Sequence, residues 1–261
     1  YPTFNEYPAR FCNSETVEIP VNKDTFEYTV EDILKVVDAE NANNVLLINP
    51  DNPTGHFLKK EDVFKLLDEL KERNVQLIFD ESFIDFAEKD IRYTLIDEEI
   101  IAKYPNLVII KSISKSYGVP GLRLGILVNQ DAALIDKVAK NNSIWNINSF
   151  GEYFLQIFDK YKGSYKEACD KVADERIRFA NELSKISGIK VYPSQANYLL
   201  CEYSGKMNIT ELTEKLLEDY NLLVKNLIRK QVFEGRNFMR VAVIEPENND
   251  LLIAALKQEC K

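Results

Sequence analysis

The sequence predicts an α/β fold in which a mostly parallel sheet is sandwiched by helices, followed by a smaller α+β C-terminal domain. Short strands that are apolar along their whole length alternate with helical patterns in the first half of the chain, as in sheets covered on both faces. Beyond about residue 160 the strands become shorter and the pattern changes. We therefore expect a large domain over residues 1–160 and a small domain over residues 161–261.

The composition is that of a water-soluble globular protein. The 261 residues are 45% hydrophobic and 29% charged, and the formal net charge of -9 argues against binding to nucleic acid or anionic membranes. No apolar run approaches the length of a membrane span. The widely spaced Cys12, Cys169, Cys201 and Cys260, with His56 as the single histidine, argue against a zinc site or a disulfide framework. We expect a cytoplasmic protein.

The first elements follow from apolar pattern and turn residues. Residues 16–20 predict a short strand, and Thr29 with Asp32 predicts the capped start of a helix. The apolar run 45–48 predicts a strand, which ends where two prolines and a glycine in 49–55 exclude regular structure.

The sheet continues through alternating elements. Apolar residues at helical spacing predict a helix over 59–73. Continuous apolar runs predict strands over 75–79, 107–110 and 126–128.

The second half of the chain alternates helices with shorter strands. Helices are predicted over 131–141 and over 148–187, the latter interrupted near 162–164. The remaining predicted elements are strands over 189–192, 197–202, 222–225 and 238–244 and helices over 209–219 and 249–261.

The stretch 112–125 between two core strands carries the residues of a covalent chemistry. A lysine at a strand end, partly desolvated and close to another cation, can lose its proton and attack a carbonyl carbon, and Lys115 is placed for this. Ser112, Ser114 and Arg123 can donate to a phosphate. The alternative is a solvated lysine in a polar turn.

Three polar residues each follow the carboxyl end of a different predicted strand: Asn52, Asp80 and Lys115. Ligands of such sheets bind beyond these ends, so we expect one pocket there. Arg240 lies in an apolar strand, which a solvated surface does not explain.

Several ordered motifs together resemble those of the class I/II aminotransferases, pyridoxal-phosphate enzymes of fold type I. Within that family the sequence is most similar to histidinol-phosphate aminotransferase and threonine-phosphate decarboxylase. The motifs are NPDNPTG at 49–55, DESFIDF at 80–86, SISKSYGVPGLRLG at 112–125 and FMRVAV at 238–243, with WNIN at 145–148 and YPSQANY at 192–198 in support.

The resemblance implies a role for each candidate residue in holding the cofactor. Lys115 would bind pyridoxal phosphate covalently and shuttle the substrate proton, and Asp80 would pair with the pyridine nitrogen. Asn52 would donate to the phenolic oxygen. Ser112, Ser114 and Arg123 would hold the phosphate, and Phe4 would stack on the ring. Without the resemblance, Asp80 is explained by a helix N-cap, Asn52 by a turn and Phe4 by a core.

For the substrate, the resemblance implies that Arg240 binds the α-carboxylate, with Asn52 and Lys225 nearby. Two departures from the family pattern bear on the substrate. Phe83 replaces a tyrosine common in aminotransferases, which favours the decarboxylase group, whereas Lys225 stands where that group tends to have arginine. The chain opens at Tyr1 without the family's N-terminal segment, which predicts a truncated large domain.

The resulting hypothesis is a pyridoxal-phosphate-dependent aminotransferase acting on an amino acid or amine that carries a phosphate or phosphonate. Decarboxylation of the threonine-phosphate decarboxylase type is the alternative reaction, and a non-catalytic binding or regulatory domain is the alternative of another class. The resemblance also implies a homodimer with an amino donor and an oxo-acid acceptor as small-molecule partners. No metal is expected.

Overall fold

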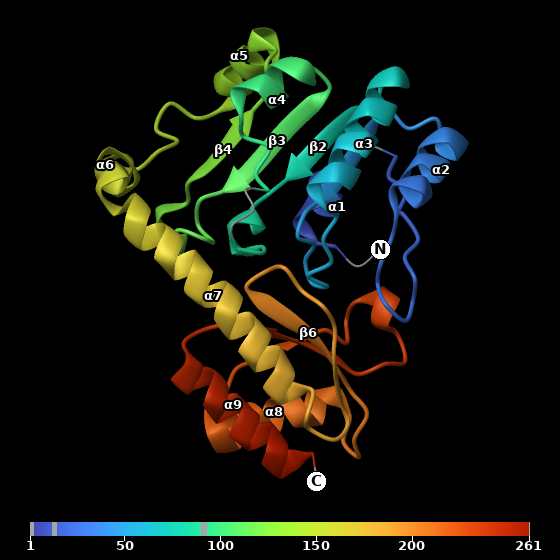
Figure 1. Cartoon of the computed structure of the whole chain (residues 1–261), viewed down its shortest axis with the longest axis vertical. Helices are drawn as coiled ribbons and strands as arrows, with labels where there is room; N and C mark the ends of the chain where they lie inside the picture. The colour runs from blue at the N-terminus through green and yellow to red at the C-terminus, as the bar shows by residue number, and fades with distance from the viewer. Residues whose placement is uncertain (1–2, 12–14, 90–92, 261) are drawn as a thin grey trace. The chain divides into compact units, whose positions relative to one another are not determined.

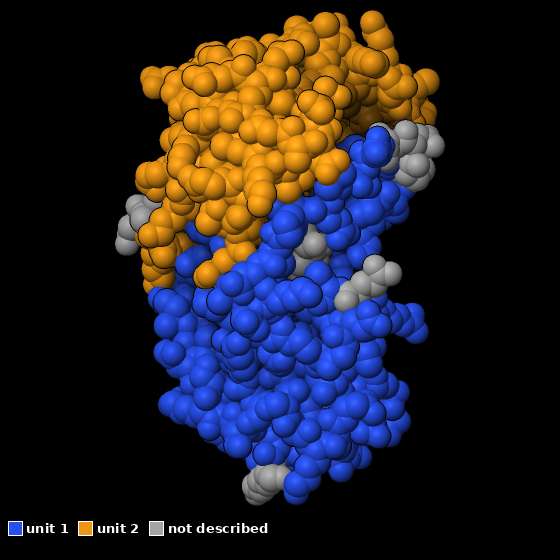
Figure 2. All heavy atoms as spheres, turned by 90° about the vertical axis from the view of Figure 1, so that its right-hand side faces the viewer, with its two compact units in different colours: residues 1–26, 51–57, 170–261 blue, residues 27–50, 58–169 orange. Residues whose placement is uncertain are grey.

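The computed structural model describes residues 3–11, 15–89 and 93–260, and these form two compact units. Unit 1 draws on residues 1–26, 51–57 and 170–261, and unit 2 on residues 27–50 and 58–169 (Figure 2). Tyr1, Cys12 and Lys261, which entered the sequence analysis, lie outside the described residues. Each unit has its own sheet.

Unit 2 is built on a four-stranded sheet in the order β1-β2-β3-β4 (Figure 1). The first three strands are parallel and β4 is antiparallel to β3. Their bounds are β1 Asn44–Ile48, β2 Gln76–Asp80, β3 Leu107–Ser112 and β4 Gly125–Val128. Because β1 to β3 run the same way, their carboxyl ends lie at one edge of the sheet.

The helices of unit 2 follow the predicted apolar spacing. The Thr29 side chain accepts a hydrogen bond from the Asp32 amide and Asp32 accepts one in return, which confirms the predicted cap. In α3 the predicted apolar face, from Val63 to Leu70, is buried. The bounds are α2 Val30–Glu40, α3 Lys60–Glu72, α4 Glu98–Lys103, α5 Ala132–Asn141 and α6 Ser149–Ile157, with short 3-10 helices η1 Ile84–Phe86, η2 Pro120–Leu122 and η3 Phe158–Tyr161.

Unit 1 has an antiparallel sheet in the order β5-β6-β8-β7, and α7 Lys162–Leu183 contributes residues to both units. The strands are β5 Ile189–Val191, β6 Tyr198–Tyr203, β7 Lys225–Asn226 and β8 Phe238–Ala242. The helices that belong to unit 1 alone are α1 Glu6–Arg10, α8 Ile209–Tyr220, α9 Pro246–Glu259 and the 3-10 helix η4 Gln231–Phe233. The predicted fold class, an α/β sheet followed by a smaller α+β part, is confirmed.

Three predicted elements differ from the structure. The strand predicted over 222–225 is shifted, because only Lys225 belongs to β7 and residues 222–224 form no strand. Residues 16–20 form no strand; all but Ile19 are exposed, so no apolar face holds this segment against a neighbouring strand. The break in the long helical stretch lies at η3, one turn before the glycine that suggested it, because Gly163 is tolerated in the first turn of α7. In the described part of the chain, no helix is long and apolar enough to cross a membrane.

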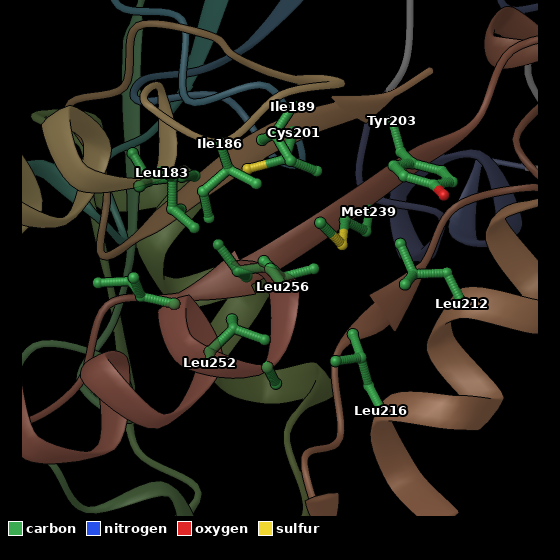
Figure 3. Close-up of a cluster of buried hydrophobic side chains, with 14 of the residues drawn as sticks. Leu183, Ile186, Ile189, Cys201, Tyr203, Leu212, Leu216, Met239, Leu252 and Leu256 are labelled. Atoms are coloured by element: carbon green, nitrogen blue, oxygen red, sulfur yellow. The ribbon is translucent and has the colours of Figure 1, made fainter. Parts of the chain in front are cut away.

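The core of unit 1 gives the first prediction. Leu216 and Leu217 are neighbours on α8, but Leu216 is fully buried in a cluster with Leu212 and Leu252 (Figure 3), whereas Leu217 is 46% exposed. Leu216→Ala should lower the free energy of unfolding by about 2–5 kcal/mol through lost transfer energy and a cavity. Leu217→Ala should change it by less than about 0.5 kcal/mol. Urea unfolding followed by circular dichroism measures both, and equal effects would contradict the packing described.

Candidate active site

At the end of β2, the carboxylate of Asp80 is fixed by its neighbour in the chain. Asp80 Oδ1 accepts hydrogen bonds from the Ser82 amide at 2.9 Å and from Ser82 Oγ at 2.5 Å. Ser82 Oγ in turn accepts the Ser112 amide at 2.9 Å. Asp80 is buried, and this relay ties its orientation to the last residue of β3.

The predicted lysine lies on the connection between β3 and β4. Ser112 pairs with Gly125, and the Ile113 amide donates to the Leu124 carbonyl at 3.1 Å, so residues 113–124 form a closed loop. The Ser114 amide donates to Ser112 Oγ at 3.3 Å. Lys115 is therefore held at the same edge of the sheet as Asp80, which is the last residue of β2.

One property expected of Lys115 is corrected by the structure. We expected its side chain to be partly desolvated at the strand end, but it is exposed. The change is local, because Ser114, the residue before it, is buried, whereas Lys115 lies on the loop between the strands and is exposed.

Arg123 lies on the same loop as the two serines. Its backbone is left-handed, with φ 56°, and its Nη1 donates to the Pro120 carbonyl at 3.2 Å. The hydrogen bond between Ile113 and Leu124 closes the loop, so Arg123, the residue before Leu124, lies close to Ser112 and Ser114 in unit 2. One loop thus carries two hydroxyl side chains, a guanidinium and an amine.

Asn52 and Arg240, predicted from distant motifs, meet in unit 1. Arg240 Nη1 donates to Asn52 Oδ1 at 2.6 Å, and its guanidinium lies 4.9 Å from the centre of the Tyr198 ring. Tyr198 Oη donates to the Asp51 carbonyl at 2.6 Å, which holds the loop that carries Asn52. Arg240 binds the side-chain oxygen of Asn52. The role that the resemblance implies for Asn52, donation to the cofactor, uses the other side-chain atom, the amide nitrogen, so the two roles do not compete for one atom.

A glycine fixes the far end of that loop. Gly55 has φ 76°, and a Cβ there would collide with the Ser194 side chain. Only glycine meets both conditions without strain. The Gln195 amide also donates to the Gly55 carbonyl at 3.0 Å.

Two lysines accompany Arg240. Lys225 on β7 is the direct partner of Arg240 on β8, so both side chains lie on the same face of the sheet. Lys230 Nζ donates to Asn5 Oδ1 at 2.7 Å and also to the Thr3 carbonyl. Burial lowers the pKa of Lys230, and the positive charges of Arg240 and Lys225 act in the same direction, against an opposing effect of the Asp51 carboxylate.

Phe4 lies in the segment that Lys230 holds. Its ring is 47% exposed and contacts Tyr7 edge to face, with 6.2 Å between the ring centres. The predicted residues therefore fall into two sets. Unit 2 carries Asp80, Ser112, Ser114, Lys115 and Arg123, and unit 1 carries Phe4, Asn52, Lys225 and Arg240.

Sequence reasoning missed Ser82 and Lys230. The spacing Asp-x-Ser at 80–82 is a local signal, because an aspartate commonly accepts from groups two residues ahead. Lys230 has no such signal, since its partners lie more than 200 residues away in the chain. Within the described residues, no group of histidine, cysteine and acidic side chains is arranged to hold a metal ion.

Comparisons with known proteins agree with this architecture. The chain is 33% identical to the L-serine phosphate decarboxylase of Sulfurospirillum multivorans, over 100% of this chain and 67% of that protein. It is 30% identical to a histidinol-phosphate aminotransferase of Caldanaerobacter subterraneus, over 99% of this chain and 69% of that protein. The chain thus spans about two thirds of the length of these curated relatives.

A solved structure shows the same fold. A decarboxylase from Sulfurospirillum multivorans superimposes with a TM-score of 0.89 at 33% identity, covering 100% of this chain and 74% of that one. The sequence profile of aminotransferase class I and II matches residues 1–256. On this evidence the chain belongs to the aminotransferase class I and II family.

Proposed function

We propose that this chain belongs to a pyridoxal-phosphate-dependent decarboxylase that acts on a phosphorylated amino acid of the phosphoserine kind. The activity of the whole protein is proposed here, because the chain spans only part of its relatives. The proposal departs from the sequence prediction, in which transamination came first. Its support is the charge arrangement around Arg240 together with the likeness to L-serine phosphate decarboxylase.

The residues of unit 2 fit the cofactor by their chemistry. An oriented carboxylate, an accessible amine, two hydroxyls and a guanidinium lie on two adjacent strand ends. Asp80 would keep a proton on the pyridine nitrogen, and Lys115 would bind the aldehyde carbon and move the proton at the substrate α-carbon. When bound, pyridoxal phosphate supplies an electron sink for the bond that breaks.

The phosphate and the ring face of the cofactor would be held by the remaining predicted residues. Ser112, Ser114 and Arg123 can donate to the phosphate oxygens from one loop. In unit 1, the amide of Asn52 would donate to the phenolic oxygen and the exposed ring of Phe4 would stack on the pyridine. The chemistry of these side chains supports the proposed roles.

The observation that carries the substrate proposal is the cation cluster of unit 1. Lys225 and Arg240 are direct partners on one face of the sheet, and Lys230 is close enough for both charges to affect its pKa, with Asp51 and Glu18 partly offsetting them. A single arginine suffices for one α-carboxylate. A phosphate monoester carries about -1.5 to -2 charges at pH 7 and matches several cations. The cluster therefore favours a substrate with two anionic groups.

The charge cluster also bears on the reaction. When bound, pyridoxal phosphate would take up the electrons of the bond that breaks. If Arg240 binds the α-carboxylate, that group would be retained and Lys115 would remove the α-proton, as transamination requires. If the phosphate occupies Arg240 with Lys225 and Lys230, the α-carboxylate would not be retained by Arg240 and could leave as carbon dioxide, with Lys115 supplying a proton to the α-carbon.

Transamination stays the second candidate because a histidinol-phosphate aminotransferase is 30% identical over nearly the whole chain. The two reactions separate by their products. The purified chain, supplied with pyridoxal phosphate and phosphoserine, should release carbon dioxide without forming an oxo-acid. Serine should react at least about tenfold more slowly, the equivalent of about 1.4 kcal/mol of lost phosphate binding. Oxo-acid formation that depends on added 2-oxoglutarate would instead establish the aminotransferase.

Other sequence predictions continue as part of this proposal. We propose a large cofactor-binding domain over residues 1–160 and a small one over 161–261, a homodimer, and a cytoplasmic location. A non-catalytic binding role is the remaining alternative, and unchanged function after loss of the Lys115 amine would favour it.

A further inference from the structure

A buried ion-pair cluster in unit 2 lies directly behind the residues assigned to the cofactor. Lys111 Nζ lies 2.8 Å from Asp85 Oδ1 and 3.4 Å from Glu81 Oε1. The Glu81 side chain is fully buried, and that of Lys111 is 6% exposed. Burying charged groups costs free energy unless they are paired, and buried charges do not contribute to solubility. The presence of this cluster therefore suggests another role.

Each member of the cluster is fixed by further bonds. Glu81 Oε1 accepts Thr94 Oγ1 at 2.5 Å, and Glu81 Oε2 accepts the Leu95 amide at 2.9 Å. Burial raises the pKa of Glu81, although the positive charge of Lys111 opposes this. Burial alone would lower the pKa of Lys111, but the carboxylates of Asp85 and Glu81 outweigh it and raise the value. The ammonium of Lys111 therefore stays charged at neutral pH.

The cluster touches the proposed active site at both of its ends. Glu81 directly follows Asp80 in the chain. At the other end, Ser116 Oγ donates to Asp85 Oδ2 at 2.8 Å, and Ser116 directly follows Lys115. A connected path thus runs from the residue beside the carboxylate to the residue beside the amine.

The loop has a second, apolar anchor one residue further on. The Tyr117 ring stacks on Tyr165 with centres 4.3 Å apart and also contacts Phe158 at 4.8 Å. Aromatic stacking holds residue 117 against its neighbours but sets no polar orientation at residue 115. The contact between Ser116 and Asp85 is therefore the directional one.

We propose that Glu81, Lys111, Asp85 and Ser116 form a positioning network that fixes the backbone at Lys115 relative to Asp80. These four residues touch neither amine nor ring; they act through the residues that do. The inference rests on the proposed function for its catalytic consequence, whereas the geometric part concerns this chain alone. It also gives a role to Asp85 in the DESFIDF motif, which the assigned cofactor contacts leave unexplained.

Ser116 offers the sharpest test because its substitution cuts the link without removing a buried charge. In Ser116→Ala the amides of residues 114–118 should exchange with deuterium at least about tenfold faster than in the wild type. Reductive methylation of the cofactor-free protein with formaldehyde, followed by peptide mass spectrometry, should show an altered rate at Lys115. Ser116→Thr, which keeps the hydroxyl, should restore both values. The exposed Ser164, changed to alanine, is the matched control.

The turnover number kcat is a further readout, because a network that only stabilised the fold would leave it unchanged. Misplacement of a reacting group by about 1 Å can cost about 100-fold in rate, so kcat of Ser116→Ala should fall by about 10- to 100-fold with KM little changed. Asp85→Asn should reproduce the exchange and labelling changes of Ser116→Ala. If deuterium exchange at residues 114–118 and methylation of Lys115 in Ser116→Ala both equal those of the wild type, the network only stabilises unit 2 and the proposal is overturned. Since exchange and labelling need no cofactor or substrate, absence of decarboxylation would count against the proposed function and not against the network.

Discussion

Lys115→Ala is expected to abolish covalent attachment of pyridoxal phosphate and to lower turnover by at least about 1,000-fold. The reason is that, in the proposed function, one amine performs two tasks: it would form the bond to the cofactor aldehyde, and it would move the proton at the substrate carbon, a step worth about 100- to 10,000-fold by itself. Borohydride reduction of the loaded protein followed by mass spectrometry measures attachment. Product formation from phosphoserine measures turnover.

The matched control is Lys137→Ala, an exposed lysine on α5 that has no assigned role. It should keep both attachment and turnover. Borohydride fixation of the cofactor at another lysine of the wild type would contradict the assignment of Lys115. Full turnover by Lys115→Ala would contradict the catalytic role of Lys115. A wild type without turnover, whose biological function survives Lys115→Ala, would favour the binding-domain alternative.

The shared location of the candidate residues in unit 2 could be predicted from the sequence because it follows from the positions of the strand ends. Parallel strands place their carboxyl ends at one edge of the sheet. Asp80 ends one apolar run, and Ser112 and Lys115 follow the next, so these residues were expected to lie at the same edge. The capping pair Thr29 and Asp32 was predictable for a similar reason, since both partners lie within one helical turn.

What escaped prediction depends on contacts between distant residues. Lys230 meets Thr3 and Asn5 across more than 200 residues, and no local pattern encodes such a contact. The apolar alternation at 16–20 predicted a strand, but a strand needs a partner, and the segment stays exposed. Exposure of Lys115 was missed because apolar runs report the burial of strands and not the path of the loop between them.

The motif at 80–86 shows how sequence and structure complement each other. The sequence showed that Phe83 lacks the hydroxyl usual in aminotransferases, and the structure adds that its ring is buried, so it contributes packing. The structure also connects Ser82 to Asp80, a contact for which the Asp-x-Ser spacing is a local signal, and Asp85 to Ser116, a contact that the motif alone does not indicate. The motif thus combines Asp80, the proposed cofactor ligand, with Ser82, which orients it, and Asp85, which binds the neighbour of Lys115.

Arg240→Ala is expected to lower kcat/KM for phosphoserine by about 30- to 150-fold, the equivalent of about 2–3 kcal/mol for charge-assisted hydrogen bonds. The variant loses the guanidinium and also leaves Asn52 Oδ1 without the donor that now lies 2.6 Å away. Arg240→Lys should recover only part of the loss, because an ammonium keeps the charge but not the planar fork. Steady-state kinetics of the three proteins, with Arg229→Ala as an exposed control, measures this series.

The same series tests whether the anion bound at Arg240 is the phosphate. If phosphate occupies the cluster of Arg240, Lys225 and Lys230, then Lys225→Met should weaken phosphoserine and leave the slow reaction of serine nearly unchanged, since serine has no phosphate to lose. If Arg240 instead holds the α-carboxylate alone, Arg240→Ala will weaken serine and phosphoserine equally. That second pattern would favour transamination, because a carboxylate bound by Arg240 would be retained while the α-proton is removed.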